Sequence, residues 1–201
     1  MLRVFKIYFS HPLIWVYIFI EIFLAGYLVY DDRLFQYLYL FLILLIAPFY
    51  EWLLHKYILH GKNANESESK QKYMNRLHRD HHRYPSQVDL LFAPLSAGLS
   101  IPIQFFVVGS VLTLNLTIGI YLAFVSMTYY LFYEWIHLAH HVETYRPSTK
   151  WGKSLKTSHL LHHYKNENYW WGVTSNLGDR ILKTFPKSGD VQKSTTVKEI
   201  N

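Results

Sequence analysis

Long apolar runs alternate with polar stretches along this chain, and the lengths of the runs predict membrane-spanning helices. Residues 13–30 and residues 34–54 each contain a single charged side chain, and a longer apolar region, residues 90–136, has a natural break near Asn115. The hydrocarbon core of a bilayer, about 30 Å thick, requires roughly 20 helical residues. We therefore predict an all-α integral membrane protein with four spans, at residues 13–30, 34–54, 92–113 and 116–136.

The same pattern predicts one membrane-embedded domain over residues 1–186, in which the polar segments form a helical cap. Residues 187–201 are polar and contain few large apolar side chains, so we expect a disordered tail there. The alternative for the first two runs is a pair of buried helices in a soluble core. Helices with almost no polar face would need a much larger protein around them than these 201 residues provide.

The distribution of charge orients the predicted spans. Of the 20 lysine and arginine residues, all except Arg33 lie on the side that holds the N-terminus, the polar segment 55–89 and the C-terminal region. The positive-inside rule makes this side cytoplasmic, so both termini and the histidine clusters are expected there. Contact with anionic lipid head groups then accounts for the net charge of +6, and no nucleic-acid partner is expected. The absence of cysteine excludes disulfides and thiolate metal sites.

Histidine is the residue type that points to chemistry, because 11 of the 12 histidines fall in four clusters at or just beyond the ends of predicted spans. The clusters are HKYILH (His55, His60), HRDHH (His78, His81, His82), HLAHH (His137, His140, His141) and HLLHH (His159, His162, His163). Offsets of three and four residues lie on one face of a helix. The second and fourth clusters are therefore each predicted to present three imidazoles to one point. Imidazole is the commonest metal ligand, so this concentration predicts a metal site.

The two halves of the chain repeat one arrangement: a helical hairpin, Tyr-Glu-Trp, one histidine, a second histidine four or five residues later, and HxxHH. Five ligands in each half suggest ten ligands around two metals, with either His140 or His141 surplus. We favour His141 as the ligand because residues i and i+4 share a face best. The predicted ligands are His55, His60, His78, His81, His82, His137, His141, His159, His162 and His163.

Two carboxylates, Glu51 and Glu134, precede the first histidine of each half by one helical turn. They are candidates to orient ligating imidazoles by accepting from the second ring nitrogen. The alternative is that each is an interfacial carboxylate that reaches water.

The ligand type narrows the chemistry. All-imidazole ligation suits iron, zinc, copper or nickel. A closed structural zinc site uses four ligands, so ten ligands for two ions indicate a dinuclear site with room for exogenous oxygen ligands. Iron with open positions activates dioxygen, and acyl chains at the bilayer surface carry C–H bonds that need such an oxidant. Metal transport or storage is the non-enzyme alternative, although transport sites lie near the bilayer midplane.

At these residues the chain resembles the integral-membrane fatty acid hydroxylase and sterol desaturase superfamily, and within it the fatty acid 2-hydroxylases. The resemblance covers residues 48–186 and is carried by HKYILH, HRDHHRYPSQVDLLFAP, YEWIHLAHH and HLLHHYKNENYWWGVTSNLGDRILKTF. The third motif matches a His-x3-His box, which supports His137 and His141 and leaves His140 as the extra residue. The Gly-Val-Thr-Ser stretch in the last motif points toward acyl hydroxylases, and Asp179 stands at an acidic position of that motif.

The resemblance implies two iron ions, which zinc can replace in isolated protein, in a cytoplasmic cap on four membrane helices. It implies a monooxygenase that uses dioxygen to hydroxylate a membrane lipid acyl chain at carbon 2, with Asp179 as a further supporting carboxylate. Because no haem-binding motif is visible, we expect a separate electron-transfer protein, and a bacterial inner membrane rather than the endoplasmic reticulum. A carotenoid hydroxylase and a lipid or sterol desaturase of the same superfamily are the alternatives.

Overall fold

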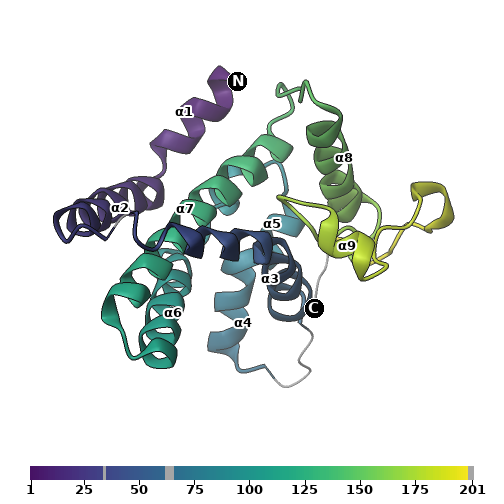
Figure 1. Cartoon of the computed structure of the whole chain (residues 1–201). Coiled ribbons are helices and arrows are strands. Elements are labelled where there is room, and N and C mark those ends of the chain that lie inside the picture. Colours follow the sequence, from purple (N-terminus) through teal and green to yellow (C-terminus); the bar gives the residue numbers. More distant parts are fainter. Residues whose placement is uncertain (34, 62–65, 199–201) are drawn as a thin grey trace.

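The computed structural model describes residues 1–33, 35–61 and 66–198, and these residues form helices without any strand. Figure 1 shows how the helices are arranged. In chain order they are α1 (Leu2–Ser10), α2 (Pro12–Tyr30), the 3-10 helix η1 (Leu38–Leu45), α3 (Ala47–Leu53), the π-helix η2 (Leu54–Leu59), α4 (Glu68–Met74), the π-helix η3 (Asn75–Arg79), α5 (Asp80–Arg83), the 3-10 helix η4 (Val88–Leu90), α6 (Leu95–Thr113), α7 (Leu116–His141), α8 (Lys150–Tyr164), α9 (Leu177–Ile181) and the 3-10 helix η5 (Ser188–Asp190).

Three segments of the described chain are long and apolar enough to cross a membrane: Pro12–Tyr30, Val88–Thr113 and Leu116–His141. They coincide with three of the four predicted spans. α6 and α7 form an antiparallel hairpin, and the predicted break near Asn115 is its turn. Leu114 takes the left-handed conformation (φ 52°) that ends α6, and Asn115 Oδ1 accepts from the backbone N–H groups of Thr117 and Ile118 to cap α7.

The second predicted span, residues 34–54, is not one regular helix, and its first residue lies outside the described residues. Within it, η1 is followed by Ile46 and then by α3, because Pro48 has no amide hydrogen to continue a helix. A 3-10 helix rises about 2.0 Å per residue, so η1 and α3 together cover about 26 Å. η1 packs beside Tyr121 and Val125 of α7, and His55 lies near His137 at the other end of that helix. The segment therefore runs along α7 as an interrupted helix, and a fourth span here stays a prediction.

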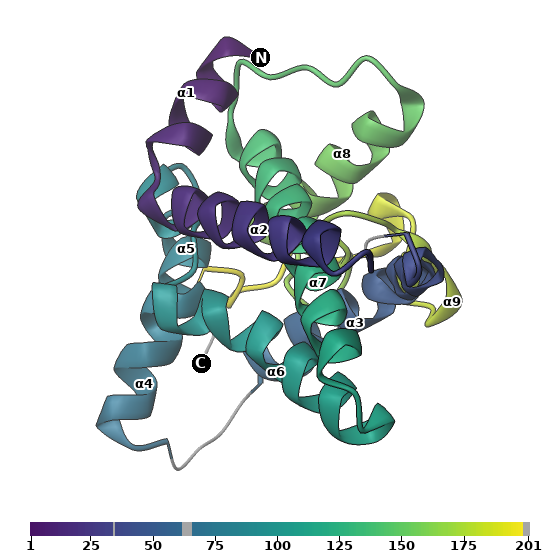
Figure 2. The same ribbon diagram turned by 60° about the vertical axis from the view of Figure 1, so that its left-hand side comes forward.

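The N-terminal helices pack against α7, which α2 crosses in Figure 2. Leu13 and Tyr17 of α2 pack with Met127 and Tyr130 of α7. The hydroxyl of Tyr17 donates to the backbone carbonyl of Gly98, which ties α2 to α6 as well. α7 is therefore the central helix, and it carries its histidines out of the apolar layer into the cap.

The cap consists of α8, the loop that follows it, α9 and the C-terminal segment. Residues 187–198 are not a free tail as predicted: Val191 and Val197 are buried, and the backbone N–H of Ser194 donates to the carbonyl of Lys165. Glu167, itself buried, accepts from the hydroxyls of Ser194 and Thr196. These contacts hold the segment against the cap, although its polar composition predicted disorder. The remainder of the predicted tail, 199–201, lies outside the described residues.

Candidate metal centre

The ten predicted ligands come together in two groups of five, and each is buried. Site A contains His55, His60, His78, His82 and His162, and site B contains His81, His137, His141, His159 and His163. Within each site, one nitrogen of every ring lies within 4.8 Å of the corresponding nitrogens of the others. Ligands about 2.1 Å from one ion lie at most about 4.2 Å apart, so a shift of a few tenths of an ångström would let each group hold one ion.

Each HxxHH motif is divided between the two sites, which corrects the prediction that its three imidazoles meet at one point. The outer pair of the first motif, His78 and His82, belongs to site A, whereas His81 belongs to site B. In the second motif the outer pair belongs to site B, whereas His162 belongs to site A. Residues i and i+4 are about 40° apart around a helix, but i+3 and i+4 are separated by about 100°. One short helix therefore serves two adjacent ions.

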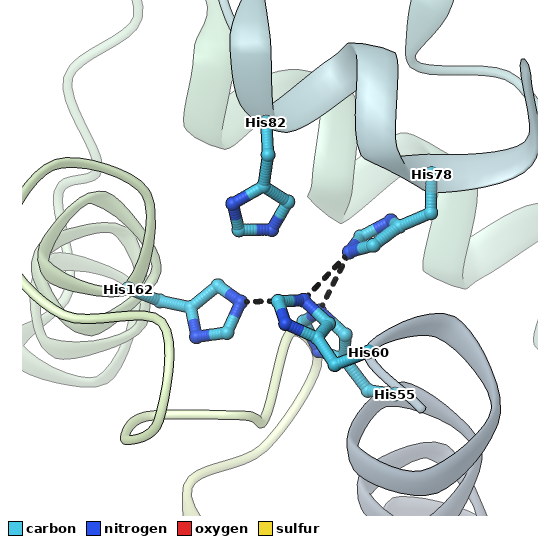
Figure 3. Close-up of side chains that lie close together, drawn as sticks. All are labelled: His55, His60, His78, His82 and His162. Atoms are coloured by element: carbon cyan, nitrogen blue, oxygen red, sulfur yellow. Dashed lines mark hydrogen bonds between the residues drawn. The ribbon is translucent and has the colours of Figure 1, made fainter. Parts of the chain in front are cut away.

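In site A the ring nitrogens face one another with no acceptor or donor between them (Figure 3). The Nε2 of His78 lies 3.1 Å from Nε2 of His55 and 3.0 Å from Nε2 of His60, and the latter lies 3.3 Å from Nε2 of His162. A single N–H cannot satisfy all of these contacts, whereas one cation at their centre would accept every lone pair. The donor set therefore fits a metal ion.

The donor set of site B also fits a metal ion, and the observation that shows the fit is a different one. Both ring nitrogens of His81, His137 and His163 are buried without a hydrogen-bond partner, which is costly unless another group satisfies them. The Nε2 atoms of His141 and His159 lie 2.8 Å apart. The rings of His82 from site A and His163 from site B stack with centroids 3.9 Å apart, so the two sites adjoin, and we call them together the centre.

Burial keeps these imidazoles in their neutral form. It lowers the pKa of His55 to about 4, although the hydrogen bond to the carbonyl of Trp171 opposes the shift. Burial followed by the neighbouring imidazoles also lowers the pKa values of His78 and His159 well below their ordinary value. Neutral rings retain the lone pair that a metal requires.

Backbone carbonyls orient three ligands of site A. The Nδ1–H of His55 donates to the carbonyl of Trp171 (2.6 Å), and the Nδ1–H of His162 donates to the carbonyl of Tyr169 (2.8 Å). The carbonyl of Val197 accepts at 3.4 Å from Nδ1 of His82. Since Nδ1 carries the proton in each case, Nε2 is left to face the centre of the site.

Two buried carboxylates hold the loop that supplies the carbonyl facing His55. Glu51 accepts from the backbone N–H groups of Val173 and Thr174, and from the hydroxyls of Thr174 (2.7 Å) and Tyr129 (3.0 Å). Asp179 accepts from the backbone N–H groups of Trp171 (3.0 Å) and Gly172 (2.7 Å). Together they fasten the segment 171–174, which we call the clamped loop.

The predicted action of the carboxylates on imidazoles therefore needs correction. Glu51 does not hydrogen-bond to a histidine among the described residues; it acts through the clamped loop. Glu134 accepts from the backbone of Ala93, and its neighbour His137 has both ring nitrogens unpaired. Both carboxylates precede a histidine by one turn, so spacing alone could not tell them apart. Their hydrogen-bond donors come from other parts of the chain, Val173 and Thr174 for Glu51 and Ala93 for Glu134.

His140 belongs to neither site. Its Nε2–H donates to the carbonyl of Val173 (3.0 Å), so this ring supports the clamped loop from the opposite side. The prediction that His141, and not His140, joins the ligand group agrees with this placement.

A long apolar cavity of about 590 Å³ ends at the centre, where His55, His78 and His137 line it. One face of α7 forms a wall, composed of Leu122, Val125, Ser126, Tyr129, Tyr130, Tyr133, Glu134 and His137. α6 forms a second wall, and η1, α3 and η2 form a third. The volume is within the range of cavities that hold small-molecule ligands.

Two residues that support the ligands of site A, Trp171 and Tyr129, were not predicted from the sequence. The ring of Trp171 lies against His55, His60 and His162, with centroids 5.5, 4.8 and 5.1 Å away, and its carbonyl orients His55. Tyr129 joins the Glu51 network from α7. No periodicity relates the aromatic run 169–171 to the histidines, so no signal in the sequence predicted the role of Trp171.

Comparison with known proteins agrees with the fold and the site. The model of the fatty acid hydroxylase family matches residues 40–184. Two curated relatives from Arabidopsis thaliana, the dihydroceramide fatty acyl 2-hydroxylases FAH1 and FAH2, are 28% and 25% identical over 70% and 68% of this chain. The chain spans 57% and 55% of their lengths. These relatives come from a plant, so they do not support the expected bacterial membrane.

A solved structure described as full-length scs7p, in which only the hydroxylase domain is visible, has the same fold. It superposes with a TM-score of 0.76 at 23% identity, over 91% of this chain and 68% of that one. The family match covers all ten clustered ligands, both halves of the centre and the clamped loop. The chain belongs to the fatty acid hydroxylase family.

Proposed function

We propose that this protein hydroxylates the acyl chain of a membrane lipid at carbon 2, using two iron ions, dioxygen and an external source of electrons. The observation that carries the proposal is the apolar cavity that ends on ligands of both sites. Its apolar lining would bind a hydrocarbon tail, and its end beside the histidines would place the carbon to be oxidised next to the metal ions. The activity in the names of the plant relatives supports the choice of an acyl 2-hydroxylase over other reactions.

The ten histidines of sites A and B would hold the ions, five to each. Bound iron would supply the activation of dioxygen and the capacity to break an acyl C–H bond. In the balanced reaction, one C–H bond becomes C–OH, the second oxygen atom leaves as water, and the partner provides two electrons with two protons.

The residues of the chain bind and align the substrate. The walls from α6, α7 and η1 would hold the tail and exclude water, since most of their lining side chains are aliphatic or aromatic. The polar end of the lipid would lie beside His55, His78 and His137, which brings carbon 2 to the centre. Glu51 and Asp179 would keep His55 of site A in place through the clamped loop.

We propose a separate electron-transfer protein with an acidic surface as the partner. A groove on the outer side of α8 is lined by the exposed lysines Lys150, Lys153 and Lys187. The acids between residues 146 and 187 are Glu167 and Asp179, and both are buried. Ligands of both sites are on α8, so a carrier in this groove would be about one helix diameter, 10–12 Å, from the centre.

The proposed orientation places the histidine sites, both termini and this groove on the cytoplasmic side. The positive-inside rule supports it, because 19 of the 20 lysine and arginine residues lie on that side of the apolar segments.

Lipid mass spectrometry tests the function. A host supplied with iron and oxygen would express either the wild type or His78→Ala, matched for protein level. We expect an acyl species that gains one oxygen at carbon 2 in the wild type alone. Loss of two hydrogens would indicate a desaturase, and an unchanged lipid profile with a competent reductant would reject the proposal.

A further inference from the structure

The cavity has a defined far end, away from the centre. On α7 its lining residues recur at intervals of three and four from His137 back to Leu122. On α6 they run in the opposite direction and finish at Val108. The two helices are antiparallel, so Leu122 and Val108 meet at the same depth.

Two glycines close the space beyond Leu122. A Cβ built on Gly109 would lie 2.7 Å from Cδ1 of Leu122, so Leu122 packs directly on the backbone of α6. A Cβ on Gly119 would lie 2.6 Å from the carbonyl oxygen of Phe106 and would also meet the hydroxyl of Ser110. The helices are therefore in backbone contact there, and no hydrocarbon chain can pass between them.

On the side of α7 that faces α2 and η1, a core cluster lies beside Leu122. Leu28, Tyr121 and Val125 are completely buried and pack with Ile43 and other side chains of η1. Because protein interiors are close-packed, the methyl groups of Leu122 are the last atoms that a ligand in the cavity would reach on α7.

The depth of the cavity corresponds to a particular chain length. His137 and Leu122 are 15 positions apart on α7, which at about 1.5 Å per residue is about 22 Å. Both side chains lean toward the N-terminus of the helix, so this spacing applies to their ends as well. Carbon–carbon bonds of about 1.52 Å at about 111° advance an extended chain by about 1.25 Å per carbon, so about 18 carbons fit.

We propose that Leu122 determines the length of the acyl chain that the site accepts, with a limit near 18 carbons in the extended form. The inference rests on the proposed function for its substrate, but the barrier that Leu122 and the contact of α6 with α7 form at this end of the cavity is a property of the fold. It assigns specificity to a residue far from the metal ligands.

Substitutions at Leu122 test the proposal in both directions. The leucine side chain extends two bonds past Cβ, so Leu122→Ala is expected to raise the preferred length by about two carbons. Leu122→Phe is expected to lower it by a similar amount. Leu116→Ala is the matched control, since Leu116 is on the same helix but 67% exposed and outside the cavity. Products from a mixture of acyl chains of graded length would be measured by mass spectrometry.

Gly109→Ala provides a second test that acts through the same side chain. Its added Cβ would displace Leu122 into the cavity and shorten the accepted chain. In the Leu122→Ala background the same change should have a much smaller effect, because the displaced methyl groups are absent. Equal shifts in both backgrounds would contradict the assignment to Leu122.

Lipid bound to purified protein separates this proposal from the proposed function. Native mass spectrometry of His78→Ala, alone and combined with Leu122→Ala or Leu122→Phe, would measure the length of retained acyl chains without any turnover. The same shifts in length are expected. If the shifts occur but the wild type makes no 2-hydroxy product, the function is wrong and the length limit stands. Identical length profiles in every variant would overturn the length limit, whatever the activity.

Discussion

Sites A and B have the same number and type of ligands, but the chain supports them differently. The ligands of site B are on regular helices: two on α7, two on α8 and His81 on α5. Site A takes His55 and His78 from π-helices and His60 from the residue after η2. Three of its rings are oriented by carbonyls from the 169–171 segment and from Val197.

This difference shows that a group of histidines can be aligned mainly by helix geometry, as in site B, or with several outer hydrogen bonds, as in site A. Fixed helical spacing keeps the pairs His137/His141 and His159/His163 on common faces. Site A has irregular helices, so it requires the clamped loop and the C-terminal segment. We expect site A to be the weaker of the two and the one that responds to distant substitutions.

The largest effect is expected from removing a ligand of either site. His78→Ala and His159→Ala should each lower 2-hydroxy product more than ~100-fold, since even outer partners of ligands alter activity by about 10–100-fold. Product per folded protein in membranes checks this. A variant that keeps more than a tenth of wild-type activity would remove that residue from the centre.

Glu51→Gln should weaken site A selectively. Glu51 accepts hydrogen bonds from four donors, and the substitution places a side-chain N–H group among them. The clamped loop should therefore loosen, and the carbonyl of Trp171 should no longer hold His55. Metal affinity of site A should fall by about 10–100-fold, with site B nearly unchanged. Chelator-release kinetics would resolve the two ions. Glu134→Gln is the control, and equal loss from both sites in Glu51→Gln would contradict the selectivity.

Truncation after Asp190 should also weaken metal binding at site A, but less than Glu51→Gln does. It removes the carbonyl that accepts from His82 and the buried side chains Val191 and Val197. Release of the site A ion should accelerate about 10-fold. Val197→Ala retains the carbonyl, so it should behave more like the wild type than the truncation does. If the site A ion were released equally fast from both variants, the buried side chain of Val197, and not its carbonyl, would account for the effect.

The smallest effect is expected from His140→Ala. The ring donates to the carbonyl of Val173 and is outside both ligand groups. Loss of one hydrogen bond should cost about 1 kcal/mol of unfolding free energy, with two ions still bound. Thermal unfolding together with metal analysis checks this, and loss of an ion would return His140 to the ligand set.

The sequence predicted which histidines gather but not how they are divided. Periodicity identifies faces, so it favoured His141 over His140, and His141 is the one of the two that lies in a histidine group. It could not predict that His81 and His162 exchange sites, because that depends on the angle at which α5 meets α8. Likewise, composition identified residues 34–54 as apolar but did not show the interruption before Pro48. The return of the C-terminal segment is set by tertiary packing.

Metal content per folded chain tests the central claim most directly. Purified wild type, His78→Ala, His159→Ala and the double variant would be analysed by elemental mass spectrometry after mild chelation. The account predicts two ions in the wild type, one in each single variant and none in the double variant. A folded wild type that binds a single ion, or a single variant that keeps both, would contradict the division of ten histidines into two sites.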